Sequence, residues 1–421
     1  MDVTLEKAEG IDIRVRAPPS KSYTHRALIA AALADGTSTL EHPLDATDTA
    51  ITAEGLIRLG IRIDRDGNRL LVTGSGGVLN CAEGTELRMG DSGTSFRLLT
   101  SVALLCKTPV ILTGSARMRE RPVDGLVAAL NAIGGRIRYL GARGFPPLLI
   151  EGELTGGEVR VESSISSQFA SSILLAAPCA RSAVELQIPP GAVSRSYLDV
   201  TADVMASFGV PVERRGYEQF RVLPAPYRAR TYRIEGDYSS ASYFFAMAAV
   251  CGGKATVENL APASVQGDRA LLDALAGMGC RVSATGEAVT LESEGRLDGI
   301  ERDMSASPDI VQTLCMVAAH ADSPSRFTGI SHLQYKESDR IRAILEVIRA
   351  LGGDAAREQD AIVIRPAPLH GGVIAAGNDH RTAMSAAVLG LAVGGVTISG
   401  AECVSKSFPE FWKILHEVGL A

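Results

Sequence analysis

Short polar segments, rich in hydroxyl groups and charge, stand directly before strongly apolar stretches of this sequence. They are Ser20-Lys21-Ser22, Asp91-Ser92-Gly93-Thr94, Ser166-Ser167-Gln168, Asp237-Tyr238-Ser239-Ser240, Pro308-Asp309 and Asn378-Asp379-His380-Arg381. If the apolar stretches are helices, unpaired N–H groups and partial positive charge at their N-termini favour phosphate and carboxylate ligands. Ser, Asp and Asn also cap ordinary helices, so capping explains each segment taken alone.

Cations accompany these segments, at the expected helix starts or in the loops between them. They are Lys21, Arg26, Arg97, Arg117, Arg119, Arg121, Arg195, Lys336, Arg340, Arg381 and Lys406. The chain as a whole is acidic, with a formal net charge of −6, which argues against a general nucleic-acid binder. Arginine suits bidentate binding of carboxylate or phosphate, and lysine supplies a point charge or a proton. Together they predict a strongly anionic ligand, although a solvated surface charge explains Arg119 and Arg195 equally well.

Two acidic residues are expected among these cations. Asp309 stands at the start of an apolar stretch, and Glu337 lies in the segment YKESDR. A carboxylate between cations stays charged, which suits a general base or a ligand for a hydroxyl group. Asp339 is interpreted as structural, paired with Arg342 three residues along a helix.

These residues need elements to position them, and internal repetition indicates which elements. Six amphipathic stretches with helical spacing end in a glycine, 67 to 75 residues apart. The glycines are Gly60, Gly134, Gly209, Gly279, Gly352 and Gly419. Each occupies the place of a left-handed helix cap, and alternating, strand-like sequence that predicts a hairpin follows most of them.

A second series of six stretches is alanine-rich and apolar nearly all round, as in helices buried on every side. Their starts, near Ser22, Thr94, Ser167, Ser239, Asp309 and His380, are 70 to 73 residues apart. A short strand candidate follows most of them. The predicted unit is therefore buried helix, strand, outer helix and hairpin, in six copies. A compact pseudo-symmetric α/β fold fits this unit better than an open solenoid, which stays as the alternative.

Composition limits the class of protein. A chain of 421 residues with 46% hydrophobic and 21% charged residues is expected to form two globular domains. The start of the chain shows no leader, and no apolar run reaches about 18 residues, so a cytoplasmic protein is expected. Seven scattered cysteines without CxxC spacing indicate neither disulfides nor a metal. Phosphate-loop, dinucleotide, HExxH and GxSxG motifs are absent.

Nine ordered segments resemble those of the shikimate-pathway enolpyruvyl transferases. They are PPSKSYTHRALIAAALADGTS, GDSGTSFRLL, LTGSARMRERPVDGL, SSISSQFASSILLAAP, SRSYLDVT, EGDYSSASYFFAMAA, YKESDRI, GNDHRTAMS and SKSFPEF. The resemblance implies an α/β fold of two domains, each an inverted barrel-like array of three βαβαββ units, with the active site in the cleft between them. It places one domain at residues 1–15 and 235–421 and an inserted domain at 16–234, and closure of the domains would exclude water.

The resemblance also implies two anionic substrates, shikimate 3-phosphate and phosphoenolpyruvate. The residues implied for shikimate 3-phosphate are Lys21, Ser22, Arg26, Ser166, Ser167, Gln168, Ser194, Tyr197, Asp309 and Lys336. Those implied for phosphoenolpyruvate are Lys21, Gly93, Arg121, Gln168, Arg340, Arg381 and Lys406. Gly93 would let the backbone approach the ligand closely.

The implied reaction is an addition followed by an elimination. The 5-hydroxyl attacks C2 of phosphoenolpyruvate, C3 gains a proton, and the intermediate then loses phosphate. Asp309 is the candidate base, with Glu337 and Lys21 sharing the other proton steps. No metal or other cofactor is expected, because lysine and arginine neutralise the developing charge.

This sequence departs from the commoner family pattern at several positions. Asp91-Ser92 replaces Asn-Ala, Leu98 stands where proline is frequent, and His332 occupies a place often held by asparagine. His332 is interpreted either as a donor to the substrate phosphate or as a surface histidine. Sensitivity to glyphosate, a competitor of phosphoenolpyruvate in the family, is expected from Gly93.

Two rival interpretations stay open. The enolpyruvyl transferase for UDP-N-acetylglucosamine shares the fold and the segment Arg121-Pro122-Val123-Asp124, but normally carries a cysteine in the loop where this chain has residues 114–120. A non-catalytic anion-binding protein would be expected to lack Lys21, Asp309, Glu337 or Lys406, and all four are present. A monomer that binds neither nucleic acid nor membrane is expected.

Overall fold

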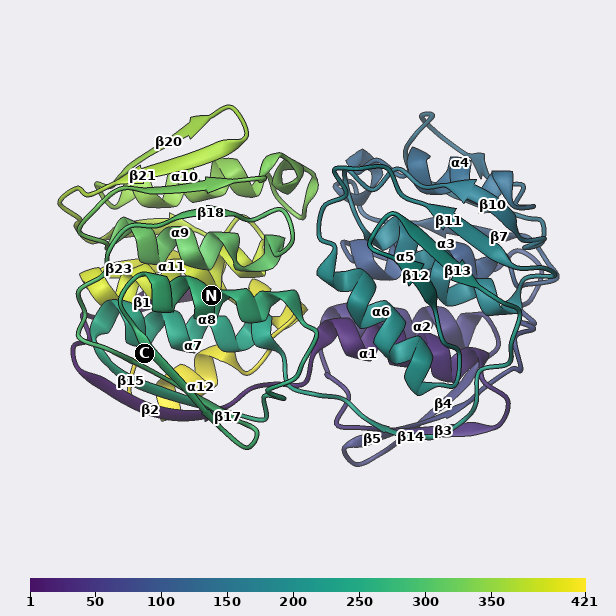
Figure 1. Cartoon of the computed structure of the whole chain (residues 1–421), viewed down its shortest axis with the longest axis horizontal. Helices are drawn as coiled ribbons and strands as arrows, with labels where there is room; N and C mark the ends of the chain where they lie inside the picture. The colour runs from purple at the N-terminus through teal and green to yellow at the C-terminus, as the bar shows by residue number, and fades with distance from the viewer. The chain divides into compact units, whose positions relative to one another are not determined.

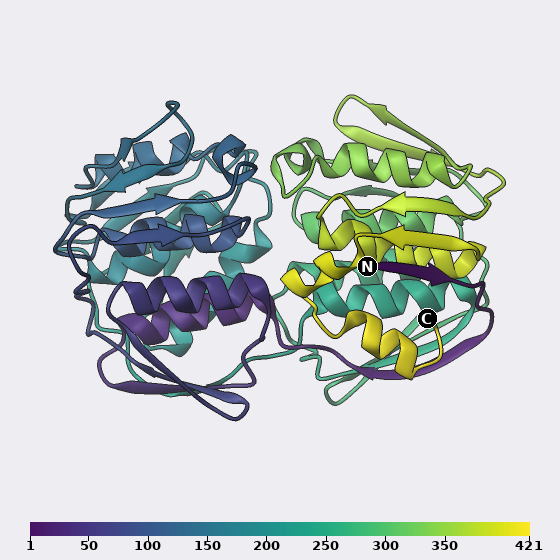
Figure 2. The same cartoon turned by 180° about the vertical axis from the view of Figure 1, so that it is seen from behind.

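The computed structural model describes all residues from 1 to 421, and they form two compact units. The first unit combines Met1–Pro18 with Glu235–Ala421, and the second is Pro19–Ile234. In each unit, small sheets and peripheral helices surround a central group of helices (Figures 1 and 2). No helix is long and apolar enough to cross a membrane.

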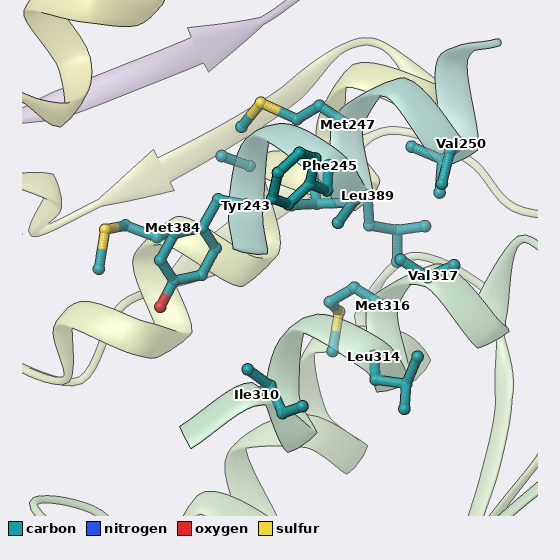
Figure 3. Packing of buried hydrophobic residues seen from close by; sticks show 14 of the residues in the cluster. Tyr243, Phe245, Met247, Val250, Ile310, Leu314, Met316, Val317, Met384 and Leu389 are labelled. Atoms are coloured by element: carbon teal, nitrogen blue, oxygen red, sulfur yellow. The ribbon is translucent and has the colours of Figure 1, made fainter. Parts of the chain in front are cut away.

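The centre of each unit is made of three helices that contact one another. They are α1 (Lys21–Leu33), α3 (Gly93–Ala103) and α5 (Gln168–Ala176) in the second unit, and α7 (Tyr238–Cys251), α9 (Val311–Ala319) and α11 (His380–Val393) in the first. Every residue of α7 and of α9 is buried. Figure 3 shows side chains such as Phe245, Leu314 and Leu389 packed between α7, α9 and α11. The prediction of six buried helices from apolar, alanine-rich sequence is confirmed.

The outer helices are amphipathic. They are α2 (Thr47–Arg58), α4 (Asp124–Ala132), α6 (Ser196–Ser207), α8 (Ala270–Gly277), α10 (Arg340–Ala350) and α12 (Phe411–Glu417). In α10, only residues 340, 341, 344, 347 and 348 are buried, which is one face of a helix. The predicted terminal glycines all have positive φ, from 75° at Gly419 to 107° at Gly134 and Gly279. The left-handed caps are therefore confirmed.

The second unit has three four-stranded sheets. Their strand orders are β14 (Thr231–Arg233), β3 (Thr37–Glu41), β5 (Arg69–Thr73), β4 (Arg62–Asp66); β6 (Glu86–Arg88), β7 (Val110–Thr113), β9 (Leu148–Ile150), β8 (Arg138–Tyr139); and β10 (Gly157–Arg160), β11 (Val184–Gln187), β13 (Gln219–Val222), β12 (Glu213–Arg215). In each sheet the first two strands are parallel and the last two form an antiparallel hairpin.

The first unit has two sheets of the same design and one of three strands. The four-stranded orders are β16 (Arg281–Thr285), β17 (Ala288–Ser293), β15 (Gly253–Glu258), β2 (Ile11–Arg16); and β18 (Glu301–Asp303), β19 (Ser325–Thr328), β21 (Ala361–Arg365), β20 (Asp354–Glu358). The third is β1 (Asp2–Leu5), β23 (Val396–Ser399), β22 (Gly372–Ala375). Strand β2 alternates buried and exposed residues, so one face packs on the core.

Three sheets are completed by strands from distant parts of the chain. Strand β14 pairs in parallel with β3, β2 pairs in parallel with β15, and β1 pairs antiparallel with β23. In the sixth sheet, β1 takes the place of one hairpin strand. The fold therefore has six repeats of α/β structure, three in each unit, as the sequence predicts.

Candidate active site

In the first unit, Arg340 is the centre of a cluster of three carboxylates. Its Nη1 donates to Asp309 (2.9 Å), its Nη2 to Glu337 (2.8 Å) and its Nε to Asp379 (3.0 Å). The Arg340 side chain is only 2% exposed. Burial alone would lower the pKa of Arg340, but the charges of Asp379, Glu337 and Asp309 outweigh it and raise the pKa. The guanidinium is therefore permanently charged and holds three carboxylates in fixed positions.

Each of the two predicted site carboxylates also faces a second cation. Nη2 of Arg381 lies 2.9 Å from Oδ2 of Asp309, and Nζ of Lys406 lies 3.7 Å from Oε1 of Glu337. Local sequence explains the placement. Asp309 lies in the 3-10 turn η4 (Pro308–Ile310) just before α9, Arg381 is in the first turn of α11, and Lys406 ends the 3-10 segment η6 (Ala401–Lys406). The starts of two buried helices thus bring these charges together.

His332 and Lys336 lie beside this cluster. His332, in the 3-10 segment η5 (Ser331–Tyr335), is 3% exposed, and its Nε2 has no hydrogen-bond partner. Burial and then the charge of Lys336 lower the pKa of His332 to about 3, so the ring is neutral at ordinary pH. The interpretation of His332 as a surface histidine is therefore wrong, and a buried neutral imidazole stands there.

In the second unit, Lys21 begins α1 and forms an ion pair with Asp48. Nζ of Lys21 lies 3.3 Å from Oδ2 of Asp48, with side-chain exposures of 13% and 3%. Asp48 is the second residue of α2, and Ser95 Oγ donates to its backbone carbonyl (3.1 Å). A lysine held at a helix N-terminus by a buried carboxylate is well placed to meet an anion or to transfer a proton.

Gly93 is the first residue of α3 and lies directly against the guanidinium of Arg121. A Cβ on Gly93 would be 2.6 Å from Cζ of Arg121, closer than real Cβ atoms approach other atoms. Arg121 is 4% exposed and has a further contact to Sδ of Met118 at 3.9 Å. Glycine at 93 therefore leaves the space that Arg121 occupies at the start of α3.

Arg26 is held by groups of the protein itself. Its Nε donates to Thr201 (2.8 Å), its Nη1 to the carbonyl of Ser22 (3.0 Å), and its Nη2 to Ser171 and to the carbonyl of Tyr197 (both 3.3 Å). Burial lowers the pKa of Arg26 to about 10, so the group stays charged. Four N–H groups are thus used to join α1, α5 and α6, and we interpret Arg26 mainly as the cation that organises Ser22 and Tyr197.

Gln168 joins the starts of α3 and α5. Its Nε2 donates to Oγ1 of Thr94 (3.0 Å), and its Oε1 accepts from Nη1 of Arg97 (2.8 Å). The backbone N–H of Gln168 donates to Ser166 Oγ (3.2 Å). A predicted ligand residue is therefore oriented by two side chains of the neighbouring helix.

Three serines near the starts of α5 and α6 have buried hydroxyls without a hydrogen-bond partner. They are Ser163, Ser167 and Ser194, with exposures of 2%, 1% and 3%. The backbone of Ser194 has a φ of 57°, a value that residues other than glycine rarely adopt. The backbone N–H of Val193 donates to the carbonyl of Ser163 (3.1 Å). Buried hydroxyls are normally paired, so unpaired ones beside a helix N-terminus favour a site that an anion completes.

Some expectations from the sequence are modified. Asp339 is structural, but its carboxylate caps α10 by accepting from the backbone N–H of Arg342 (3.2 Å), and the Arg342 side chain pairs with Glu346. Arg119 and Arg195 are exposed, Arg195 lying 5.3 Å from the ring centre of Tyr217. These two cations have the surroundings of surface charges.

Three residues that order the clusters have no role in the prediction from sequence. Asp48 holds Lys21, Asp379 is the third carboxylate on Arg340, and Thr94 contacts Gln168. From the sequence, Asp379 and Thr94 are recognised only as members of the polar segments at helix starts. Asp48 gives no local signal, because its partner is 27 residues away and reaches it only through the packing of α1 on α2.

The fold and these clusters define a class of protein: an α/β protein of six repeats that gathers lysine, arginine and carboxylate groups at helix starts for anionic ligands. Residues 5–415 match the family EPSP synthase (3-phosphoshikimate 1-carboxyvinyltransferase). The chain therefore belongs to the EPSP synthase family.

Individual relatives agree with this assignment. A protein of Methanoregula boonei named 3-phosphoshikimate 1-carboxyvinyltransferase is 54% identical, over 99% of this chain and 100% of its own length. One of Methanosphaerula palustris with the same name is 55% identical over 100% of both chains. Among solved structures, EPSP synthase from Acinetobacter baumannii matches with a TM-score of 0.83 and 26% identity, covering 100% of this chain and 98% of that one.

Proposed function

We propose that this protein transfers the enolpyruvyl group of phosphoenolpyruvate to the 5-hydroxyl of shikimate 3-phosphate and releases phosphate. In the addition, the hydroxyl oxygen forms a bond to C2, the C2=C3 electron pair takes up a proton at C3, and the hydroxyl proton passes to a base. In the elimination, C3 loses a proton, the C2=C3 bond reforms, and the C2–O bond to phosphate breaks. The net products are the enolpyruvyl ether and phosphate.

The observation that carries the proposal is the Arg340 cluster. It holds two carboxylates, Asp309 and Glu337, in fixed positions, and gives each a second cation, Arg381 and Lys406. An addition–elimination needs groups that accept and return protons together with positive charge against the phosphate and carboxylate of the substrate. This arrangement has both, on residues that the family resemblance independently assigns to the reaction.

In the proposal, Asp309 accepts the proton of the 5-hydroxyl, and Glu337 and Lys21 share proton transfer at C3 and at the leaving phosphate. Lys21 begins a buried helix and is held by Asp48, which supports a fixed cation there. Lysine and arginine side chains neutralise charge on the intermediate, so the proposed reaction uses no metal or other cofactor.

The two proposed substrates use the groups described above. Shikimate 3-phosphate is assigned to Lys21, Ser22, Arg26, Ser166, Ser167, Gln168, Ser194, Tyr197, Asp309 and Lys336. Phosphoenolpyruvate is assigned to Lys21, Gly93, Arg121, Gln168, Arg340, Arg381 and Lys406. The unpaired hydroxyls of Ser167 and Ser194 support the first assignment, and the Gly93–Arg121 contact supports the second. The protein is further proposed to act as a cytoplasmic monomer.

The test is a phosphate-release assay with chelator-treated protein, phosphoenolpyruvate and one of two acceptors, shikimate 3-phosphate or UDP-N-acetylglucosamine. Release with shikimate 3-phosphate alone, undiminished by the chelator, is expected. Release with the nucleotide sugar alone would transfer the assignment to the other enolpyruvyl transferase. No release with either acceptor would leave an anion-binding protein.

A pair of variants then separates catalysis from binding. Asp309→Ala is expected to reduce kcat far more than it weakens binding of shikimate 3-phosphate, measured by calorimetry. Asp303→Ala, on exposed β18 six residues earlier, is the matched control and should leave both unchanged. Equal losses of kcat and affinity in Asp309→Ala would remove its role as the base.

A further inference from the structure

Asp268 is a buried carboxyl to which the proposed reaction assigns no role. It lies in the 3-10 turn η3 (Gly267–Arg269) and is 4% exposed. Ser239, in the first turn of α7, donates a hydrogen bond from Oγ to Oδ2 of Asp268. Burying a carboxyl group costs free energy unless the group is paired or protonated. The neighbours of Asp268 therefore decide which charge state is stable.

One face of α7 links Asp268 to the Arg340 cluster. Ser239 and Tyr243 are four residues apart and lie on the same side of this helix. Ser239 binds Asp268, while the hydroxyl of Tyr243 lies 3.4 Å from Nη1 of Arg381. Arg381 in turn forms the ion pair with Asp309 at 2.9 Å. The helix therefore connects Asp268, through Ser239 and Tyr243, with the guanidinium that pairs with Asp309.

A second connection joins the two turns that carry the carboxyls. Ser307 Oγ donates to the backbone carbonyl of Gly267 (2.9 Å). Gly267 immediately precedes Asp268, and Ser307 stands two residues before Asp309. Both turns also contact α7. The positions of Asp268 and Asp309 are thus fixed relative to each other by hydrogen bonding and by packing on one helix.

The charges around Asp268 come from three directions. Burial and the Asp309 carboxylate raise the pKa of Asp268 to about 7, and Asp237, just before α7, also raises it. Arg381 on α11 and the hydrogen bond from Ser239 act in the opposite direction. Two carboxyls that influence each other in this way titrate as a pair.

We propose that Asp268 is a positioning residue for the reaction, a second carboxyl whose charge sets how readily Asp309 takes up the hydroxyl proton of the substrate. Ionised Asp268 repels the negative charge of Asp309 and makes proton uptake by Asp309 more favourable; protonated Asp268 removes this effect. Arg340 and Arg381 on their own would hold Asp309 in its charged form and weaken it as a base. This inference rests on the proposed function.

The test compares the pH dependence of kcat in the wild type and in Asp268→Asn, an isosteric variant that is neutral at every pH. Below about pH 6 the two values of kcat should be similar, because Asp268 is protonated in the wild type. Above about pH 8 the wild type should be faster by roughly three- to tenfold, as expected when the proton affinity of a general base changes by one to two pKa units. The midpoint of the change in the ratio of the two kcat values should lie near the pKa of Asp268.

Two further variants make the result specific. Asp273→Asn, an exposed carboxylate on α8, should leave the ratio at one across the range. Ser239→Ala removes a hydrogen bond that stabilises ionised Asp268, so the alkaline rise in kcat should move to higher pH; this variant also serves if Asp268→Asn does not fold. The inference is overturned if the ratio of kcat in the wild type to kcat in Asp268→Asn is the same at all pH values. It is also overturned if the alkaline rise in kcat occurs at the same pH in Ser239→Ala as in the wild type.

The outcomes separate this inference from the proposed function. If the wild type releases no phosphate with shikimate 3-phosphate, the proposed function fails and the inference fails with it. If the wild type is active and the ratio is independent of pH, the inference alone fails, and Asp268 is a structural residue.

Discussion

Gly93 and Arg121 are in such close contact that a single added carbon atom at position 93 would lie 2.6 Å from Cζ of the guanidinium. Arg121 is 4% exposed, so an added Cβ would have to displace its guanidinium within buried surroundings. The size of residue 93 therefore controls the position of a cation proposed to bind phosphoenolpyruvate.

Gly93→Ala is expected to raise KM for phosphoenolpyruvate by about tenfold or more, because the displaced charge-assisted hydrogen bonds are each worth about 1.5–3 kcal/mol. KM for shikimate 3-phosphate should change little. Steady-state kinetics with each substrate varied in turn is the measurement. Gly141→Ala is the control, because a Cβ there has its nearest contact at 3.5 Å. A similar rise in both KM values would contradict a local effect on Arg121.

Ser167→Ala should affect ligand binding, whereas Ser172→Ala should affect stability. The hydroxyl of Ser167 is buried without a partner, whereas that of Ser172 bonds to Ser101 and to the carbonyl of Arg97. Ser167→Ala is expected to weaken binding of shikimate 3-phosphate without reducing the stability of the free protein. Ser172→Ala is expected to reduce stability by about 1–3 kcal/mol, the effect of leaving buried partners unsatisfied. Calorimetry and urea unfolding measure the two quantities; a large loss of stability in Ser167→Ala would argue against a role of this hydroxyl in ligand binding.

Arg340→Met should strongly destabilise the protein. It would leave Asp309, Glu337 and Asp379 without their shared cation, and removal of one partner from a buried ionic cluster reduces stability by about 3–5 kcal/mol. Arg342→Met, two residues along α10, breaks an exposed pair with Glu346 and should change stability by less than about 1 kcal/mol. Urea unfolding of both variants is the measurement, and equal effects would show that the Arg340 cluster is not an energetic centre.

His332 should make the protein sensitive to acid. In the folded state its pKa is lowered to about 3, against 6.5 for an ordinary histidine, so the unfolded chain takes up the proton first. The stability gained by keeping the ring neutral is fully present above pH 6.5 and is lost as the pH falls towards 3. At pH 5 the loss is about 2 kcal/mol, at 1.36 kcal/mol for each pH unit below 6.5.

His332→Asn lacks this titration. The difference in unfolding free energy between the wild type and this variant should therefore fall by about that amount between pH 7 and pH 5, by urea unfolding. His416→Asn, at the exposed end of α12, is the control substitution. A difference that is constant with pH would mean that His332 has the same pKa in the folded and unfolded protein.

The helices could be predicted from sequence because each depends on local pattern. Apolar residues on all sides indicated the buried series, and a terminal glycine such as Gly134 marked the end of each outer helix. The polar segments before the buried helices also indicated where charged groups would gather. In these cases the information lies within about fifteen neighbouring residues.

What could not be predicted depends on residues far apart in the chain. No local pattern pairs β14 with β3, or Asp48 with Lys21, because tertiary packing alone brings these partners together. The depth of His332 was missed for the same reason: a histidine in a polar segment resembles a surface residue until its neighbours are placed. The raised pKa of Asp268 likewise depends on its burial and on the charge of Asp309, 41 residues away.

The pairing of β1 with β23 has a consequence for biosynthesis. Residues 2–5 leave the ribosome long before their hydrogen-bonding partners, residues 396–399. The unit formed by 19–234 has all its residues available once its final strand, β14, has emerged, so it can fold while translation continues. The other unit must keep β1 unpaired until β23 has also emerged, and a nascent chain halted before β23 would leave β1 without a sheet to join.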